Sequence, residues 1–145
     1  MELVSFRMMG ASAWDYWIDY TPNVSAALEA LRSRVFESGD YYSHLSENPS
    51  SIEELVEALA EEGTHSILDI DHVSECFEYG AVWPLSGEEL SMVFGTDMPT
   101  VKDVETAQAA DKLDSLVPTG GTGRYLTTYR DDQPDKLFFF GATGD

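Results

Sequence analysis

Residues Arg124 to Phe140 read RYLTTYRDDQPDKLFFF and contain two runs that suit β-strands. β-Branched and aromatic residues dominate Arg124–Arg130 and Leu137–Phe140, and such residues pack well on a pleated sheet. Between the two runs, Asp131–Asp135 supplies the Asp and Pro residues that are typical of turns. The pattern predicts a C-terminal β-hairpin.

The N-terminal part of the chain carries a second alternating pattern. Val4, Phe6 and Met8 alternate with polar residues, and the alternation resumes over Trp14–Tyr20 after the short Gly10–Ser12 segment. Because successive side chains of a strand point to opposite faces, such alternation is typical of half-buried strands. We expect a second hairpin, or two neighbouring strands, in this region.

Four segments between the hairpins begin with a capping residue and continue with apolar residues at helical spacing. Two of them start with a capping box, in which a Ser and a Glu three residues later bond to each other's backbone. The helices are expected after Asn23 as far as Gly39, after Ser51 as far as Gly63, after Ser86 as far as Gly95, and after Thr100 as far as Pro118.

A short apolar segment, Ser66–Ile70, predicts a buried central strand, and Asp71–Tyr79 is expected to form a helical turn. Together these elements predict the α+β class. We expect a single domain over residues 1–145, with a mostly antiparallel sheet formed by the N-terminal and C-terminal β-hairpins plus one central strand. About four helices would cover one face of that sheet. A length of 145 residues suits one such core.

The overall charge restricts the class of partner. The chain has 27 acidic and 8 basic side chains, and its formal charge at pH 7 is -19. Proteins bind nucleic acids mainly through Lys and Arg, so direct nucleic-acid binding is not expected. Anionic membranes would repel the chain in the same way, and no apolar run approaches the roughly 20 residues that cross a bilayer. The single cysteine and the lack of a leader-like start favour the cytoplasm.

Acidic charge is concentrated in the middle of the chain. Residues 35–101 contain fifteen Asp and Glu residues but no Lys or Arg, and the density is highest between Ser51 and Glu75. On the second expected helix, Glu53, Glu57 and Glu61 would form a column of like charge, which costs a few tenths of a kcal/mol per pair. The candidate residues for binding a basic partner are Glu53, Glu54, Glu57, Glu61 and Glu62.

Residue types that bind metals cluster between His65 and Cys76. Imidazole, carboxylate and thiolate groups are the usual ligands of transition metals. Their spacing here matches no zinc pattern, however, and an acidic chain places carboxylates near every histidine. A cysteine nucleophile would in addition need electropositive neighbours. We therefore expect no metal and no cofactor, and the weak candidate ligands are His65, Asp69, His72 and Cys76.

Two further features have both a functional and a structural interpretation. Trp14 and Trp17 are three positions apart in the same expected strand, so their side chains would point to opposite faces of the sheet. One of them would then face a ligand or a partner, unless helices cover both faces. The glycine-rich segment 120–123 before Arg124 could cradle a phosphate, but it follows a helix and enters a strand, whereas phosphate loops lead from a strand into a helix. A flexible connector is the expected role of this segment.

These observations favour a small non-enzymatic interaction protein, of the immunity, antitoxin or regulatory type, that binds a basic partner protein. The runner-up is a small-molecule or metal-binding domain, or an enzyme, built around His65, Asp69, His72 and Cys76. A second alternative is that the acidity reflects adaptation to high intracellular salt, where screening removes the repulsion between carboxylates. The partner and the oligomeric state are left open.

Overall fold

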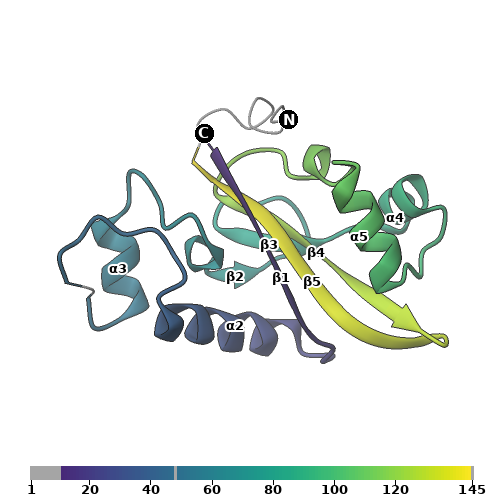
Figure 1. The fold of residues 1–145 in the computed structure, drawn as a ribbon, viewed down its shortest axis with the longest axis horizontal. Coiled ribbons are helices and arrows are strands. Elements are labelled where there is room, and N and C mark those ends of the chain that lie inside the picture. The colour runs from purple at the N-terminus through teal and green to yellow at the C-terminus, as the bar shows by residue number, and fades with distance from the viewer. Residues whose placement is uncertain (1–10, 48, 145) are drawn as a thin grey trace.

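The computed structural model describes residues 11–47 and 49–144, which form one five-stranded sheet with helices around it (Figure 1). The strand order is β1-β5-β4-β3-β2. The strands are β1 (Ala11–Asp19), β2 (His72–Val73), β3 (Ala81–Pro84), β4 (Thr122–Arg130) and β5 (Gln133–Gly144).

The sheet is mixed, so the expectation of a mostly antiparallel sheet was wrong. β5 pairs antiparallel with β1 and with β4, but β3 pairs parallel with β4, and β2 pairs parallel with β3. A parallel neighbour needs a long crossover connection, and the chain between β3 and β4 supplies one that contains two helices. The sequence pattern identified strand-forming segments but not the direction in which they pair.

The two chain ends meet in the sheet. β4 and β5 are joined by Asp131 and Asp132, whose φ angles of 53° and 65° are those that a two-residue hairpin turn of type I′ requires. The first strand of the expected N-terminal hairpin, Val4–Met8, lies outside the described residues. Its second strand is present as β1, which pairs with β5 along its whole length.

The expected central strand at Ser66–Ile70 is a short 3-10 helix instead. Helix η1 spans Ile67–Asp69, and the Ser66 side chain accepts a hydrogen bond from the backbone N–H of Leu68. Both Ile67 and Ile70 are fully buried. A short buried apolar run has the same composition in a strand and in a helical turn, which is why the sequence did not separate them. The predicted helical turn after it contains strand β2 instead.

The four expected helices are present, but two of them are shorter than expected. The helices are α2 (Val24–Ser38), α3 (Ile52–Ala58), α4 (Gly87–Phe94) and α5 (Val101–Ala109), with the 3-10 helix η2 (Asp114–Leu116) after α5. Helices α2 and α4 end at Gly39 and Gly95 as predicted. Helix α5 ends early because Asp111 adopts a left-handed φ of 57° and Lys112 bonds back to Ala107 O.

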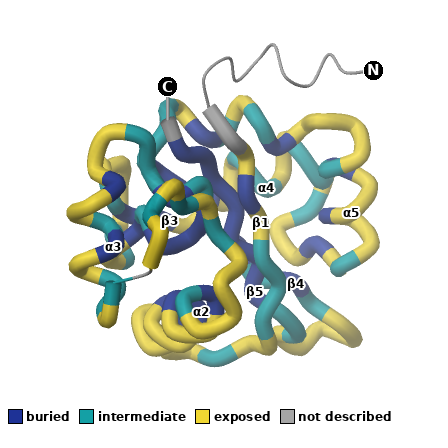
Figure 2. The backbone as a smooth tube through the Cα atoms, turned by 60° about the vertical axis from the view of Figure 1, so that its left-hand side comes forward, coloured by how far each residue is buried: buried dark blue, intermediate teal, exposed yellow. Residues whose placement is uncertain are grey.

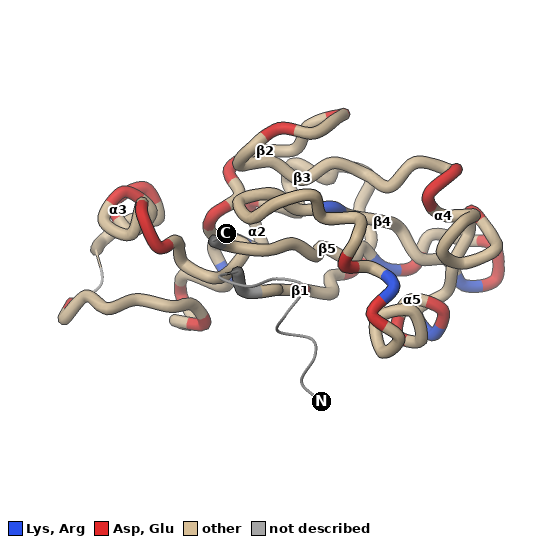
Figure 3. Tube along the Cα trace, turned by 90° about the horizontal axis from the view of Figure 1, so that it is seen from above, with Lys and Arg blue, Asp and Glu red and all other residues tan. Residues whose placement is uncertain are grey.

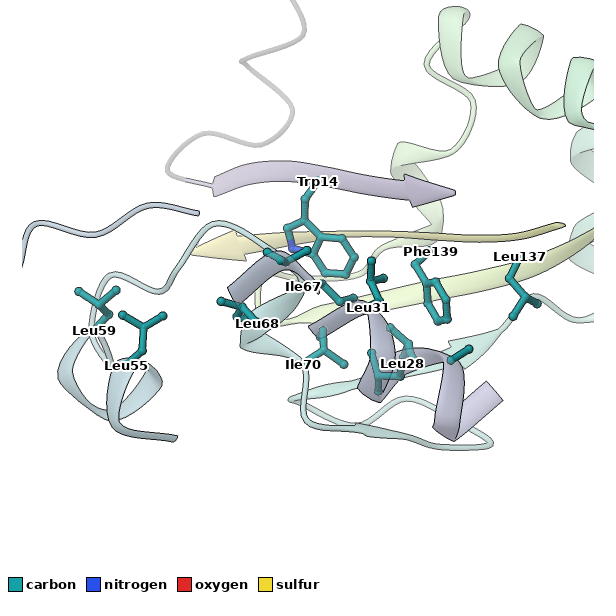
Figure 4. Packing of buried hydrophobic residues seen from close by; sticks show 13 residues of the cluster. Trp14, Leu28, Leu31, Leu55, Leu59, Ile67, Leu68, Ile70, Leu137 and Phe139 are labelled. Atoms are coloured by element: carbon teal, nitrogen blue, oxygen red, sulfur yellow. The ribbon is translucent and has the colours of Figure 1, made fainter. Parts of the chain in front are cut away.

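Helices cover both faces of the sheet, which corrects the expectation that they cover only one. Along β5, Leu137 and Phe139 point into a core cluster with α2, α3 and η1, while Phe138 and Phe140 point into a second cluster with α4 and α5. Figure 2 shows β5 as a buried segment between these layers. The close-up in Figure 4 shows the first cluster, in which Trp14, Leu31 and Phe139 lie close together.

Trp14 occupies space that two glycines leave open. Its pairing partner on β5 is Gly141, which is in turn opposite Gly123 on β4. A Cβ atom at Gly141 would lie 2.4 Å from the Trp14 ring and 2.6 Å from Thr122 O, and one at Gly123 would lie 2.7 Å from the Trp14 ring. Because these distances are far below van der Waals contact, the indole ring requires glycine at both positions.

We therefore expect Gly141→Ala to destabilise the fold by about 2 kcal/mol or more, because the added methyl group must displace the Trp14 ring or the β4 backbone. Urea unfolding of the variant and the parent protein measures this difference. Gly87→Ala is the matched control, since a Cβ at Gly87 meets nothing within 4 Å and helix α4 tolerates alanine. Equal losses of stability for the two variants would contradict the packing argument.

Candidate interaction surface

Helix α3 holds the acidic residues that the sequence singled out. Its N-cap residue Ser51 accepts a hydrogen bond from Glu54 N, and its buried Leu55, followed by Leu59, attaches it to the core. Glu53 and Glu57 are exposed on the opposite side. Figure 3 shows acidic segments on α3, whereas most of the basic segments lie toward α4 and α5. We name Glu53, Glu54, Glu57, Glu61 and Glu62 the α3 acidic surface.

The three-membered column of like charge is not formed as expected. Helix α3 ends at Ala58, so only Glu53 and Glu57 have i,i+4 spacing within it, and Glu61 lies in the turn that follows. Glu54 accepts bonds from Ser50 N at 3.3 Å and from Ser50 Oγ at 3.2 Å rather than from Ser51 N. The repulsion in the helix is therefore limited to Glu57 with Glu53 at i,i+4 and with Glu54 at i,i+3.

An open hollow lies at the C-terminal end of α3. It has a volume of about 290 Å³, and its lining includes Glu61, Glu62, Asp69, Gly121 and Thr143. Asp69 is fully engaged there, because its carboxylate accepts from Thr64 N at 2.9 Å and from Thr143 Oγ1 at 2.5 Å. Asp69 thus joins the turn after α3 to the end of β5, a structural role that the sequence did not indicate.

The four weak candidate ligands lie in separate surroundings. Asp69 is bonded to Thr64 and Thr143. The His65 ring packs edge-on against Tyr42 at a ring-centroid distance of 5.1 Å, and Cys76 is exposed. His72 bonds to Asp71 and, through Nε2, to Glu78 Oε1 at 2.7 Å. Within residues 11–47 and 49–144, no group of three or more His, Cys, Asp or Glu side chains is arranged to hold a metal ion.

The two carboxylates around His72 raise the pKa of its imidazole above 6.5, because they accept hydrogen bonds from the protonated ring, Asp71 with the larger effect and Glu78 with the smaller. The same contact with His72 lowers the pKa of Glu78. The bonds of His72 to Asp71 and Glu78 hold the start of the loop between β2 and β3 in place. Ser74 Oγ adds a bond to Glu78 at 3.0 Å.

His72→Gln should lower the melting temperature most below pH 6.5 and progressively less as the pH rises above it. A group whose pKa is raised in the folded state stabilises that state fully below the unfolded pKa, and the effect is lost as the pH passes the folded pKa. Because His72 is partly exposed, we expect an effect below about 1 kcal/mol. Thermal melts at pH 5.5, 7 and 9 test this, and a difference that grows with pH would contradict it.

Trp14 is buried and Trp17 is half-buried, so neither side chain is fully exposed to solvent. Trp14 is 6% exposed, and Trp17 packs against Phe138 with a ring-centroid distance of 4.4 Å. Tyr16, between them, accepts a bond from Ile67 N through its hydroxyl oxygen. The helical layers on both faces of the sheet account for this burial, which the sequence analysis had allowed as the alternative.

Arg124 is a buried structural residue rather than part of a phosphate site. It forms an ion pair with Glu89 at 2.6 Å and donates to the backbone oxygens of Leu116 at 2.9 Å and Pro84 at 3.0 Å. The guanidinium holds the pKa of Glu89 below its ordinary value. Its carbon also lies 4.6 Å from the Trp83 ring centroid. Gly120 and Gly121 form a turn, whereas Thr122 and Gly123 already belong to strand β4, so the expected connector is limited to its first two residues.

The sequence analysis missed one exposed feature, the pair Phe77 and Tyr79. These side chains are 46% and 69% exposed, and their rings meet at a centroid distance of 5.2 Å. The signal in the sequence was available: two aromatic residues stand at i,i+2 among acidic and turn residues, without the apolar period of a buried element.

Comparison of the chain with protein-family models, with curated proteins and with solved structures gave no match. In the part of the chain that the structure describes, no helix combines the length and the apolar composition needed to cross a membrane.

Removing the like charge on α3 should not harm the fold. We expect Glu53→Gln with Glu57→Gln to raise the free energy of unfolding by about 0.2–0.5 kcal/mol at low salt and to leave it unchanged at high salt, since the repulsion of Glu57 with Glu53 and with Glu54 is removed. Urea unfolding at 20 mM and 500 mM NaCl would measure this. A clear loss of stability at low salt would show that these glutamates have favourable contacts.

Proposed function

We propose that this protein is a small non-enzymatic interaction protein, of the immunity, antitoxin or regulatory type, that binds a basic partner protein through the α3 acidic surface. The observation that carries the proposal is the exposure of Glu53, Glu54, Glu57 and Glu61, for which no ion pair is found among the described residues. Among the described residues, Arg124 and Lys136 are paired with Glu89 and Asp19, and no Lys or Arg pairs with the α3 acidic surface. His44 reaches this surface through Glu62 at 2.5 Å.

The position of α3 also supports this function. The helix protrudes at one end of the molecule in Figure 1, and its outer face is exposed. A surface of one charge sign attracts a partner of the opposite sign and accelerates its association. The same charge disfavours nucleic acids and anionic membranes as direct partners. The cytoplasm stays the expected compartment for a chain with one cysteine.

The runner-up, an enzyme or a ligand-binding domain around His65, Asp69, His72 and Cys76, has less support. Acid–base or nucleophilic catalysis needs these groups within hydrogen-bond reach of a shared reacting atom. Asp69 is instead bonded to Thr64 and Thr143, and His72 is bonded to Asp71 and Glu78. The bonds of these residues serve local structure.

The test compares two variants that lose the same number of charges. One carries Glu53→Gln, Glu57→Gln and Glu61→Gln on the α3 acidic surface. The control carries Glu105→Gln on α5 with Asp131→Asn and Asp132→Asn, because asparagine suits the left-handed turn positions. Each immobilised variant and the parent protein are exposed to lysate of the source organism, and the retained proteins are quantified by mass spectrometry.

We expect a basic protein to be retained by the parent and the control, lost by the α3 variant, and released from the parent near molar salt, where the Debye length is about 3 Å. Equal retention by all three would contradict binding through α3. A salt series on the parent protein tests the halophilic alternative. A protein that unfolds in dilute buffer and retains no partner at any salt concentration would favour salt adaptation instead.

A further inference from the structure

The loop between β2 and β3, residues 74–80, presents aromatic side chains to solvent at one edge of the sheet. Phe77 is 46% exposed and Tyr79 is 69% exposed, although Tyr and Phe are usually buried at least in part. Adjacent exposed aromatic residues are a frequent feature of protein interfaces. The pair is therefore a candidate contact surface separate from α3.

Hydrogen bonds hold this loop in place without burying the two rings. Glu78 is bonded to His72 at 2.7 Å and to Ser74 at 3.0 Å, and Cys76 N donates to Ser74 Oγ at 3.3 Å. At the end of the loop, Gly80 N donates to Gly121 O at 2.8 Å. A surface that is ordered before binding loses less conformational entropy when a partner docks.

The exposed pair continues inward as a row of three rings. Tyr79 contacts Phe77 at 5.2 Å between centroids, and Phe77 contacts the buried Trp83 at 5.5 Å. We name these three residues the aromatic row. At its inner end, the Arg124 guanidinium already lies 4.6 Å from the Trp83 ring centroid. The inner end of the row thus binds a guanidinium within the chain, while the outer rings are exposed.

Exposed carboxylates flank the outer end of the aromatic row in the sequence, and two of them, Asp71 and Glu78, are already bonded to His72. Asp71, Glu75 and Glu78 are exposed, and Figure 3 shows the acidic segments near β2. The whole span 35–101 contains no Lys or Arg. Aromatic faces next to carboxylates suit a guanidinium, which can stack on a ring and pair with an acid at the same time. A second copy of this chain would bring like charges together, which disfavours self-association here.

We propose that Phe77 and Tyr79, with Glu75 beside them, form a docking surface for an arginine-rich segment of a basic partner protein. The guanidinium groups of that segment stack on the two rings and pair with the surrounding carboxylates. The inference shares with the proposed function only the positive charge of the partner. It uses a different surface, so each proposal can fail without the other.

The experiment uses fluorescein-labelled peptides of four Arg-Gly-Ser repeats, with a matched peptide that has Lys in place of Arg. Fluorescence anisotropy measures the affinity of each peptide for the parent protein, for Tyr79→Ala, and for Phe77→Ala with Tyr79→Ala. Tyr20→Ala is the aromatic control, because Tyr20 is 37% exposed and follows β1, the strand at the opposite edge of the sheet. A variant with Glu53→Gln, Glu57→Gln and Glu61→Gln measures how much of the peptide affinity comes from the α3 acidic surface.

We expect the arginine peptide to bind the parent severalfold more tightly than the lysine peptide. The double aromatic variant should lose about fivefold or more of that affinity, while Tyr20→Ala keeps it. Tyr79→Ala removes only the exposed outer ring of the aromatic row. If the double variant does not fold, the peptide affinity of Tyr79→Ala is used in its place. Equal affinity for both peptides, or an aromatic variant that binds as the parent does, would overturn the proposal.

Cys76 provides a positional readout because it is the single cysteine of the chain, is exposed, and precedes Phe77 directly. Bound arginine peptide should slow the alkylation of Cys76 by iodoacetamide, and the protection should disappear in the double aromatic variant. Binding without protection would place the peptide elsewhere and overturn the proposal. The proposal would also be overturned if sedimentation showed that the protection comes from self-association and if the aromatic variants abolished that self-association. Loss of peptide binding in the α3 variant alone would overturn it as well and would support α3 as the binding surface.

Discussion

The burial of Leu137–Phe140 from both sides is the constraint on which the rest of this structure depends. Four consecutive large apolar side chains in a strand point alternately to the two faces of the sheet. Each face must then be covered, because leaving one exposed would forfeit roughly 1.5–3 kcal/mol for each such side chain. Helices α2 and α3 with η1 cover one face, and α4 with α5 covers the other.

The central position of β5 follows from the same constraint. A strand that is apolar on both faces gains most when both of its edges are also paired, and β5 lies between β1 and β4. The Trp14 ring then packs closely over Gly123 and Gly141 of the neighbouring strands. The two edge strands are β1 and β2, and β2 has only two residues. Short edge strands limit unwanted pairing with other chains.

This layered arrangement leaves no open sheet face for binding in the described part of the chain. Contacts with a partner must instead use the outer sides of helices and the loops at the edges, where the exposed acidic and aromatic residues lie. Inside the molecule, by contrast, the charge of Arg124 is matched by Glu89 and by three backbone oxygens. Arg32, which is also buried, donates to Leu68 O. The excess of acidic charge lies mostly on exposed side chains, where salt and partners can reach it.

The sequence by itself determined the elements that depend on local chemistry. Capping residues such as Ser86 and glycines such as Gly39 define helix ends through bonds between near neighbours, and the structure places α2 and α4 within those limits. The exposure of Glu53 and Glu57 also followed from helical spacing. Each of these features involves residues a few positions apart, so a local pattern suffices to predict it.

Only the tertiary structure decided features that join distant segments. The parallel pairing of β3 with β4, the 3-10 form of Ile67–Asp69 and the burial of Trp14 depend on which surfaces meet after folding. The bonds of Asp69 to Thr143 and of Arg124 to Glu89 span 74 and 35 residues of sequence. No periodic pattern records such contacts, because packing and hydrogen bonding select among strands, turns and directions that are locally equivalent.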